Sequence, residues 1–545
     1  MPKFDLLRDY PNVPLWLAKA LKDPKIADLS LSAYGKHLLR LKQEHVEFEN
    51  ETMKARHQKI VPDELTFDET ALALIFKFPF YNVMMSKSGG ETLLSVYVAS
   101  GVDEGIYISN TEYFEELIDR VSPTYSPRLI DYTLNKIRRV VPKVQQTIEA
   151  HLVPVGNGIY NRKTNELEPF SPNRVYLSKI ATNYVEDAKN PTYTFADGVK
   201  WDVDSWIRSI ASDDPEIEIL LWEVISDFVQ SNYTRNKSIF LYSDKGNNGK
   251  GTYGELLENI VGNENVSHLA VKDFKHEFLK EQLIGKVGNI AHENDVDDYI
   301  DSVRDFKATI TGDNIIINRK YEKPMSFQFK GTNIQMFNGL PKTRDKSDSF
   351  YRRILLVPFL QSFTNNGERT DIKNKFIHMR DVHEYVLNRA LHIDFEEFTI
   401  PKVSAQLLDQ YKEDNNPVID FWVEFEPEFQ WSLLPSGFLY DLFTTHYDRV
   451  NPTGKVMSRQ SFLAQLRVHL DTSGSEWEDK TDRNSKVATS QRMDADEPLI
   501  SEYNLQTWMD QTYKGNDMTK MRDFKRKATY RGFVREVVEA DDDES

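Results

Sequence analysis

The sequence contains no cysteine, which excludes disulfide bonds and any zinc site built on thiolates. No run approaches the length of about 18 consecutive apolar residues that a membrane-spanning helix needs, so no membrane partner is expected. The first residues, MPKFDLLRDYPNVPLW, lack the basic and then apolar pattern of a signal peptide. The 12 histidines are scattered along the chain, which argues against a structural metal. Together these absences predict a cytoplasmic protein.

Acidic side chains outnumber basic ones, 85 to 68, and the formal net charge is −17. This balance argues weakly against a nucleic-acid partner, but the local distribution matters more than the average. Residues 514–535 contain eight basic and two acidic side chains, and residues 319–330 contain four basic and one acidic. The last residues, EVVEADDDES, are almost purely acidic. A solvated surface would give the same runs, so the runs by themselves do not identify a binding site.

The patterning of the 545 residues indicates five segments. Residues 1–150 mix helical and strand patterns, and residues 151–230 begin with a hairpin-like stretch and continue into helices. Residues 231–400 alternate strand, loop and helix, as an α/β nucleotide-binding core does. Residues 401–475 contain two short amphipathic helices joined by NPTGK, which favours a winged-helix-like module. Residues 476–545 are polar, then basic, then acidic.

The stretch SIFLYSDKGNNGKGT (238–252) resembles the phosphate-binding pattern G-x-x-x-x-G-K-[S/T] with two departures. Asp244 replaces the first glycine, and Gly251 stands where a magnesium-binding hydroxyl is usual, with Thr252 one place later. A strand at 238–242 and a helix after Lys250 would let backbone N–H groups wrap phosphate oxygens. The residues expected to contact ATP are Lys245, Gly246, Asn247, Asn248, Gly249, Lys250, Gly251 and Thr252.

A second element is KVGNIAHENDVDDY, in which a buried strand at 287–291 is expected to deliver Glu293 at its end. An NTPase needs an acid there to hold Mg²⁺, directly or through water, and to activate the attacking water. Glu293 is the first candidate and Asp295 the second, with Thr252 as the hydroxyl ligand. A strand followed by an acidic surface loop would give the same pattern.

Two further elements follow in TNIQMFNGLPKTRDKSDSFYRRILLVPF. Asn338 ends an apolar strand, where a polar side chain can orient water against the γ-phosphate. Arg352 and Arg353 precede the next apolar strand, and a guanidinium there could reach a phosphate bound by a neighbouring subunit. A surface salt bridge is the other interpretation of this pair.

The order of NNGKGT, NIAHEN, FKATITGDNIIINRKYEKP, MFNGLP and DSFYRRILLVPF resembles the superfamily 3 helicases, most closely their phage, plasmid and poxvirus primase-helicase branch. Residues 153–230 resemble the helical domain that precedes the motor of that branch, including NGIYN and three tryptophans, Trp201, Trp206 and Trp222. The resemblance covers roughly residues 153–470. The chain is also similar to the replication initiator helicases of staphylococcal mobile islands.

The resemblance implies a multidomain α/β protein with a central AAA+ P-loop ATPase core, a helical lead-in and the C-terminal winged-helix-like domain. It implies a homo-hexameric ring that uses ATP and Mg²⁺ and translocates on single-stranded DNA. The stretch NRKYEKP matches the pore hairpin, which places Arg319, Lys320, Tyr321 and Lys323 on the DNA path. A ring with a basic pore can carry an acidic exterior.

The predicted function is therefore that of a replicative DNA helicase and replication initiator of a phage, plasmid or mobile island, with origin DNA and other replication proteins as partners. Three alternatives remain open. One is primer synthesis, for which paired carboxylates would be needed, although Asp202 and Asp204 lie in the wrong setting. The others are an origin-binding ATPase switch without unwinding and an RNA helicase.

Overall fold

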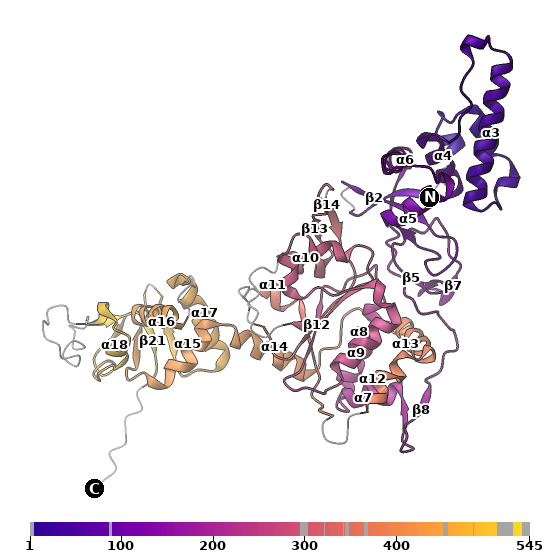
Figure 1. Cartoon of the computed structure of the whole chain (residues 1–545). Coiled ribbons are helices and arrows are strands. Elements are labelled where there is room, and N and C mark those ends of the chain that lie inside the picture. The colour runs from indigo at the N-terminus through magenta and orange to yellow at the C-terminus, as the bar shows by residue number, and fades with distance from the viewer. Residues whose placement is uncertain are drawn as a thin grey trace, which may run out of the picture. The chain divides into compact units, whose positions relative to one another are not determined.

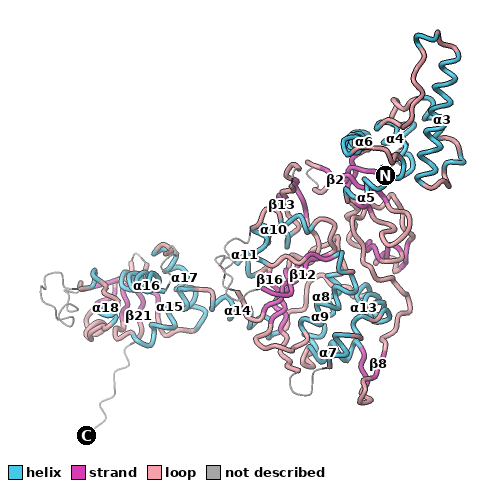
Figure 2. The backbone as a smooth tube through the Cα atoms, in the orientation of Figure 1, coloured by secondary structure: helices cyan, strands magenta, loops and turns pink. Residues whose placement is uncertain are grey.

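The computed structural model describes residues 5–86, 90–294, 304–320, 322–341, 343, 348–363, 369–450, 456–482, 484–509 and 527–536. The chain divides into two compact units, residues 1–406 and 407–545. Figure 1 labels their helices and strands, and Figure 2 shows the alternation of helix and strand along the backbone. Among the described helices, none is both long and apolar enough to cross a membrane.

The first unit begins with an α+β region in which helices cover a four-stranded sheet of order β3-β2-β1-β4. The capping box formed by Thr66 and Glu69 starts one of these helices, because it satisfies backbone N–H groups that the helix leaves open. The helices are α1 (Leu6–Asp9), α2 (Leu15–Leu21), α3 (Leu31–Glu51), α4 (Phe67–Lys77), α5 (Thr111–Val121) and α6 (Pro127–Val140). The strands are β1 (Phe80–Met84), β2 (Thr92–Tyr97), β3 (Tyr107–Ile108) and β4 (Lys143–Gln145).

A lead-in of short strands and two helices connects this region to a larger sheet. Its strands are β5 (Leu152–Val155), β6 (Gly158–Asn161), β7 (Glu166–Glu168), β8 (Thr192–Thr194) and β9 (Lys200–Asp202), and its helices are α7 (Val203–Ile210) and α8 (Pro215–Phe228). Trp201, Trp206 and Trp222 are buried in one core with the strands of the larger sheet. The lead-in therefore packs as part of the same body as the sheet.

The larger sheet has five strands in the order β11-β12-β15-β10-β16, and all neighbours are parallel. The strands are β10 (Ser238–Tyr242), β11 (Val266–Ser267), β12 (Gly288–Asn294), β15 (Asn333–Phe337) and β16 (Ile354–Pro358). Nearly every residue of β10, β15 and β16 is buried, which is typical of a parallel sheet with both faces covered. The predicted multidomain α/β fold with a parallel sheet is confirmed.

Helices cover both faces of this sheet. Successive side chains of a strand point to opposite faces, so neighbouring residues of one strand contact different helices. Ile239 and Leu241 share the core that includes α8, α9 (Lys250–Val261) and α13 (Arg380–His392). Phe240 faces the other way and contacts Phe306 of α10, with 6.4 Å between ring centroids. The remaining elements are α10 (Arg304–Thr311), the antiparallel hairpin of β13 (Asn314–Ile317) and β14 (Met325–Gln328), α11 (Asp348–Tyr351) and α12 (Thr370–Asn374).

The second unit packs short helices on a three-stranded antiparallel sheet of order β17-β21-β18, with a separate pair β19-β20. Its core is rich in aromatic side chains, among them Trp422, Trp431 and Phe438. The helices are α15 (Pro417–Phe425), α16 (Ser436–Val450), α17 (Arg459–Ser473) and α18 (Leu499–Glu502), after α14 (Lys402–Asp414), which spans the boundary. The strands are β17 (Leu433–Pro435), β18 (Glu478–Lys480), β19 (Val487–Ala488), β20 (Thr529–Tyr530) and β21 (Gly532–Val534).

Candidate functional site

The carboxyl ends of three adjacent parallel strands, β12, β15 and β10, form one edge of the sheet. Each strand delivers one element that the sequence singles out. The loop 243–249 follows β10, and Asn338 follows β15 directly. Glu293 is the residue before the last one of β12. Ligands of open α/β sheets bind at this edge, so the topology brings Lys250, Asn338 and Glu293 to the same end of the sheet.

The loop between β10 and α9 is held in shape by the side chain of Asn248, which is 5% exposed. The Asn248 amide donates to the Ser243 hydroxyl and to the Lys245 carbonyl. Its Oδ1 atom accepts from the backbone N–H of Lys250 at 3.0 Å. The loop is thus preformed by its own contacts, which reduces the ordering that a bound phosphate would require.

Two loop residues adopt left-handed backbone conformations, with φ of 52° at Asn247 and 85° at Gly249. A Cβ added at Gly249 would lie 2.7 Å from the side chain of Ile210, so α7 packs tightly against the loop and admits only glycine there. Residues 244–247 are exposed, and Gly251 is exposed at the start of α9, where a Cβ would meet nothing within 4 Å. Neither departure from the common pattern, at Asp244 or at Gly251, therefore disturbs the packing.

Lys250 is 7% exposed and contacts the end of β15. Its Nζ atom donates to the Phe337 carbonyl and, at 2.7 Å, to Oδ1 of Asn338. Burial lowers the pKa of Lys250 to about 8, because the charged form loses hydration. An anion that binds at this loop would restore a charged partner to the ammonium group, so the site is electrostatically suited to phosphate.

Glu293 lies in an irregular part of β12, and its side chain is exposed. The sequence predicts a strand that ends at residue 291, but pairing with β15 resumes after a bulge, with Asn294 opposite Phe337. Asn294 anchors this end by donating to the Met336 carbonyl at 3.2 Å. A bulge re-aims the side chains around it, so Glu293 is presented at the edge of the sheet. Asp295, the second candidate, lies outside the described residues.

Sequence reasoning missed the neighbours of His292. Its Nε2 atom lies 2.6 Å from Oε1 of Glu258 on α9, and this hydrogen bond raises the pKa of His292 above its usual value. Glu258 stands two helical turns after Lys250, where nothing in the sequence pattern connects it to β12. The pair ties α9 to the strand that carries Glu293.

Arg352 and Arg353 lie at the opposite edge of the sheet from the phosphate loop. The backbone carbonyl of Arg353 accepts from the N–H of Ser238, the first residue of β10, at 2.7 Å, and β16 then runs parallel to β10. The loop follows the far end of β10, about 16 Å away at about 3.3 Å per residue. Arg353 donates to the Ser349 carbonyl, whereas the side chain of Arg352 is exposed.

The predicted DNA-contacting residues fall on the hairpin of β13 and β14. Arg319 pairs with Glu281 at 3.0 Å and with Glu322, so its charge is largely engaged. Lys320 is exposed, and the Lys323 side chain is 83% exposed. Tyr321 lies outside the described residues. Lys323 also lies 3.8 Å from Glu91, so Lys320 and Lys323 are both exposed at the turn of the hairpin, and Lys323 has an acidic neighbour.

A pocket of about 630 Å³ opens beside the phosphate loop. Loop residues 247–249 line one side of it, and the lead-in, Phe363 and side chains between residues 369 and 374 line much of the rest. Its aromatic walls come from Phe195, Trp201, Trp206 and Phe363. From the sequence, Trp201 and Trp206 were identified only as part of the family resemblance, not as residues of a binding pocket. Concave, largely apolar pockets with a few polar groups are the usual sites of small ligands.

The candidate carboxylates for primer synthesis are engaged in structural contacts. Asp202 caps α7 by accepting from the N–H of Ser205 at 2.9 Å. Asp204 pairs with Arg389 and accepts from the hydroxyl of Tyr385 at 2.9 Å. Asp202 therefore stabilises the start of α7, and Asp204 holds α7 against α13.

Three family models match separate parts of the chain. Residues 36–211 match a model described as D5 N terminal like, and residues 413–500 match one described as Poxvirus D5 protein-like. In these two parts the chain resembles the phage and poxvirus primase-helicases of superfamily 3. This relationship confirms the resemblance predicted from the order of the motifs. Between these two matches, residues 241–353 match DUF5906, a family of unknown function.

Solved structures give a weaker likeness. The A form apo structure of the NrS-1 C terminal region is 13% identical, with 77% of this chain and 88% of that chain covered and a TM-score of 0.40. The apo structure of the NrS-1 C terminal region (305-718) is 12% identical, with 78% and 98% covered and a TM-score of 0.42. No curated protein matches the chain.

Proposed function

We propose that this protein is an ATP-hydrolysing DNA helicase that acts in the replication of a phage, plasmid or mobile island. The observation that carries the proposal is the meeting of Lys250, Asn338 and Glu293 at one edge of a parallel sheet, beside a preformed loop. A phosphate-binding ammonium, a water-orienting amide and an acid are the parts that phosphoryl transfer to water requires.

In the proposed mechanism, ATP binding breaks the contact between Lys250 and Asn338. The Lys250 ammonium moves to the β- and γ-phosphates, which frees the Asn338 amide to orient the attacking water. Glu293 accepts a proton from that water. The free N–H groups of the loop bind phosphate oxygens without further rearrangement.

A magnesium ion suits the donors that surround the phosphates. The Thr252 hydroxyl and the Glu293 carboxylate are hard oxygen ligands, which Mg²⁺ prefers. When bound, the ion would neutralise charge on the transferring phosphoryl group. The exposed position of Gly251 leaves room at the start of α9 for water.

The aromatic pocket supports a nucleoside triphosphate over a simple phosphate. It adjoins the loop at Asn247, Asn248 and Gly249, and its walls include Trp201 and Trp206. A purine base can stack on such rings, which would place the base on the lead-in side of the loop. Nucleotide binding would then add contacts between the lead-in and the loop.

The position of the arginines supports the proposed assembly into a homo-hexameric ring. Arg352 cannot reach the phosphates of its own subunit from the opposite edge of the sheet, but it can serve the site of a neighbour. The exposed lysines at the turn of the β13–β14 hairpin would then face single-stranded DNA in the ring. This arrangement accommodates the net charge of −17, since only the pore needs to be basic.

A basic groove in the second unit favours origin recognition as a second activity. A pocket of about 960 Å³ lies between α17 and the strand pair β19-β20. Five basic side chains line it, namely Arg459, Arg467, Lys486, Lys527 and Arg531. A helix flanked by a two-stranded wing suits a winged-helix module on duplex DNA. Most of the basic segment 514–535 and the acidic tail lie outside the described residues.

Two variants test the proposed motor. Lys250→Ala should lower both nucleotide binding and turnover, because it removes the main charge on the phosphates. Glu293→Gln should retain ATP binding and lower turnover by about 10²–10⁴-fold, the range expected for loss of a general base. Both should fail to unwind a forked DNA duplex. Normal hydrolysis by Glu293→Gln would refute the role of the acid, and active ATPase without unwinding would favour the origin-binding switch.

A further inference from the structure

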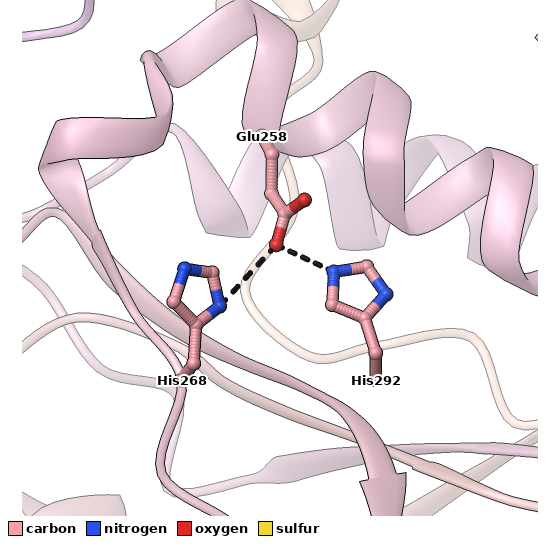
Figure 3. A group of neighbouring side chains, drawn as sticks. All are labelled: Glu258, His268 and His292. Atoms are coloured by element: carbon pink, nitrogen blue, oxygen red, sulfur yellow. Dashed lines mark hydrogen bonds and ion pairs between the residues drawn. The ribbon is translucent and has the colours of Figure 1, made fainter.

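A cluster of two histidines and one glutamate lies behind the proposed ATP site. Glu258 projects from α9, His268 follows β11, and His292 comes from β12 (Figure 3). The potential ligand atoms of the three side chains all lie within 4.8 Å of one another. Among the described residues, this is the only group of three or more such side chains at this spacing. The fold thus gathers side chains that are scattered along the sequence.

We propose that Glu258, His268 and His292 form a binding site for one divalent transition-metal ion of the Zn²⁺ class, separate from the Mg²⁺ that accompanies ATP. The site goes beyond the proposed helicase function and does not depend on it.

The distances fit a small ion with little rearrangement. Oε1 of Glu258 lies 2.6 Å from Nε2 of His292 and 3.5 Å from Nδ1 of His268. Two ligands of one tetrahedral ion at about 2.1 Å each lie roughly 3.4 Å apart. The existing contacts bracket this value, so entry of an ion requires the His292–Glu258 contact to open and leaves the three backbones in place.

The exposure of the three side chains fits access from solvent. The Glu258 side chain is 10% exposed, whereas the His268 and His292 side chains are 52% and 39% exposed. The carboxylate therefore forms the floor of the site and the imidazoles form its open rim. Three protein ligands leave a fourth position for water.

The chemistry of the donors selects the ion. Imidazole nitrogen is a good ligand for Zn²⁺, Co²⁺, Ni²⁺ and Cu²⁺, whereas Mg²⁺ and Ca²⁺ prefer oxygen alone. Nδ1 of His268, the nitrogen that faces Glu258, also lies 3.1 Å from the Ile290 oxygen. An ion bound at Nδ1 would therefore replace this contact with the carbonyl.

A bound ion would cross-link α9 to β12, and these elements carry Lys250 and Glu293 respectively. Their relative position would then be fixed by metal–ligand bonds in addition to packing. The ion would act as a structural clamp at the back of the ATP site, and it would stabilise the folded state because the unfolded chain does not hold the three ligands together.

Co²⁺ provides the most direct test, because its visible absorption reports the ligands, and the absence of cysteine removes any thiolate contribution. The full chain, without a polyhistidine tag and after EDTA treatment and dialysis, is titrated with Co²⁺ and then with competing Zn²⁺. We expect one equivalent to bind, a rise in the thermal midpoint, and no displacement by millimolar Mg²⁺.

His268→Ala is the decisive variant, because the side chain is half exposed and its loss leaves the core intact. It should weaken metal binding at least about 10-fold, and Glu258→Gln should do the same. His378→Ala is the matched control, since His378 lies 3.4 Å from Glu255 of α9, and among the described residues this pair belongs to no group of three potential ligands. The proposal is overturned if the wild-type protein binds no stoichiometric ion, if Mg²⁺ competes equally, or if His268→Ala binds as the wild type does.

Discussion

The Nζ atom of Lys250 donates a hydrogen bond to Oδ1 of Asn338 over 2.7 Å. This contact joins the residue proposed to bind phosphate to the residue proposed to orient water, and ATP must break it before hydrolysis. The strength of this hydrogen bond can be changed by substitution of either side chain.

Substitution of Asn338 should separate binding from turnover. Asn338→Ala removes both the hydrogen bond to Lys250 and the water-orienting amide. ATP binding should be retained, and kcat should fall by about 10²-fold, as for loss of one polar donor in an active site. Asn338→Asp places a carboxylate against the ammonium and should weaken ATP binding. Fluorescent-nucleotide titration and steady-state ATPase assays measure both effects. Equal ATP affinities for the two variants would show that the contact does not oppose binding.

The exposed lysines of the hairpin should govern DNA binding. The double variant Lys320→Ala with Lys323→Ala should lose DNA stimulation of the ATPase and lose unwinding. Each lost phosphate contact should also reduce the log–log salt slope of single-strand binding by about 0.7. Lys22→Ala with Lys25→Ala is a control for net charge, because both lysines are exposed in the N-terminal region. An unchanged slope in the hairpin variant would remove these lysines from the DNA path.

A mixing experiment tests whether the ATP site is shared between subunits. An Arg352→Ala subunit retains its loop but lacks the proposed finger, and a Lys250→Ala subunit has the reverse defect. Each alone should lose activity, by about 10³–10⁵-fold for the finger. Mixed rings should recover part of the ATPase, because some sites combine an intact loop with an intact arginine. Full activity of Arg352→Ala alone would contradict the assignment, and Arg353→Ala is then the next variant.

The basic groove of the second unit should bind duplex DNA. Lys486→Ala with Lys527→Ala should weaken duplex binding and reduce its salt slope by about 0.9 for each lost phosphate contact. Gel shifts at several salt concentrations measure this, and Lys402→Ala with Lys412→Ala controls for charge on α14. Unaltered origin preference in the groove variant would move sequence recognition to another part of the chain.

Glu497 should make the stability of the second unit depend on pH. Burial raises the pKa of Glu497 from its usual 4.5 to about 7, so the folded state holds this proton more tightly than the unfolded state. The contribution of Glu497 is therefore most favourable below pH 4.5 and is lost as the pH rises to about 7, a change of about 3 kcal/mol.

Denaturant unfolding of the wild type and of Glu497→Gln between pH 4.5 and 8 measures this difference. Glutamine can still accept from the N–H groups of Gln430 and Trp431, which the carboxylate contacts at 3.0 and 3.4 Å. The stability of the variant relative to the wild type should rise across this interval and then level off. A constant difference would mean that folding does not raise the pKa of Glu497.

Local sequence patterns predicted the parts of the site that lie within one strand, loop or helix. The strand before the loop and the helix that begins at Lys250 follow from residues 238–261, where apolar periodicity and glycine positions determine the backbone. The order of strands in the sheet depends on contacts between distant segments, and local patterns did not predict it. The contact between Lys250 and Asn338 spans 88 residues and needed the fold.

The features that sequence reasoning missed are assembled from distant residues. Trp206 and Phe363 line one pocket only because the lead-in packs beside the loop. His268 and His292 meet at Glu258 because β11 and β12 are neighbours. The scatter of histidines along the sequence therefore did not reveal that two of them lie close together in the fold. The strand carrying Glu293 extends past its predicted end because a bulge lets pairing resume, and single-strand patterns do not report bulges.

The open space beside Gly251 leaves room for a larger side chain at this position of the loop. Since a Cβ there meets nothing within 4 Å, a serine at this position would restore the common hydroxyl without displacing any neighbour. The packing around the loop therefore accommodates a hydroxyl at position 251 as well as the one at Thr252, so the departure from the common pattern at Gly251 is not imposed by a neighbouring side chain.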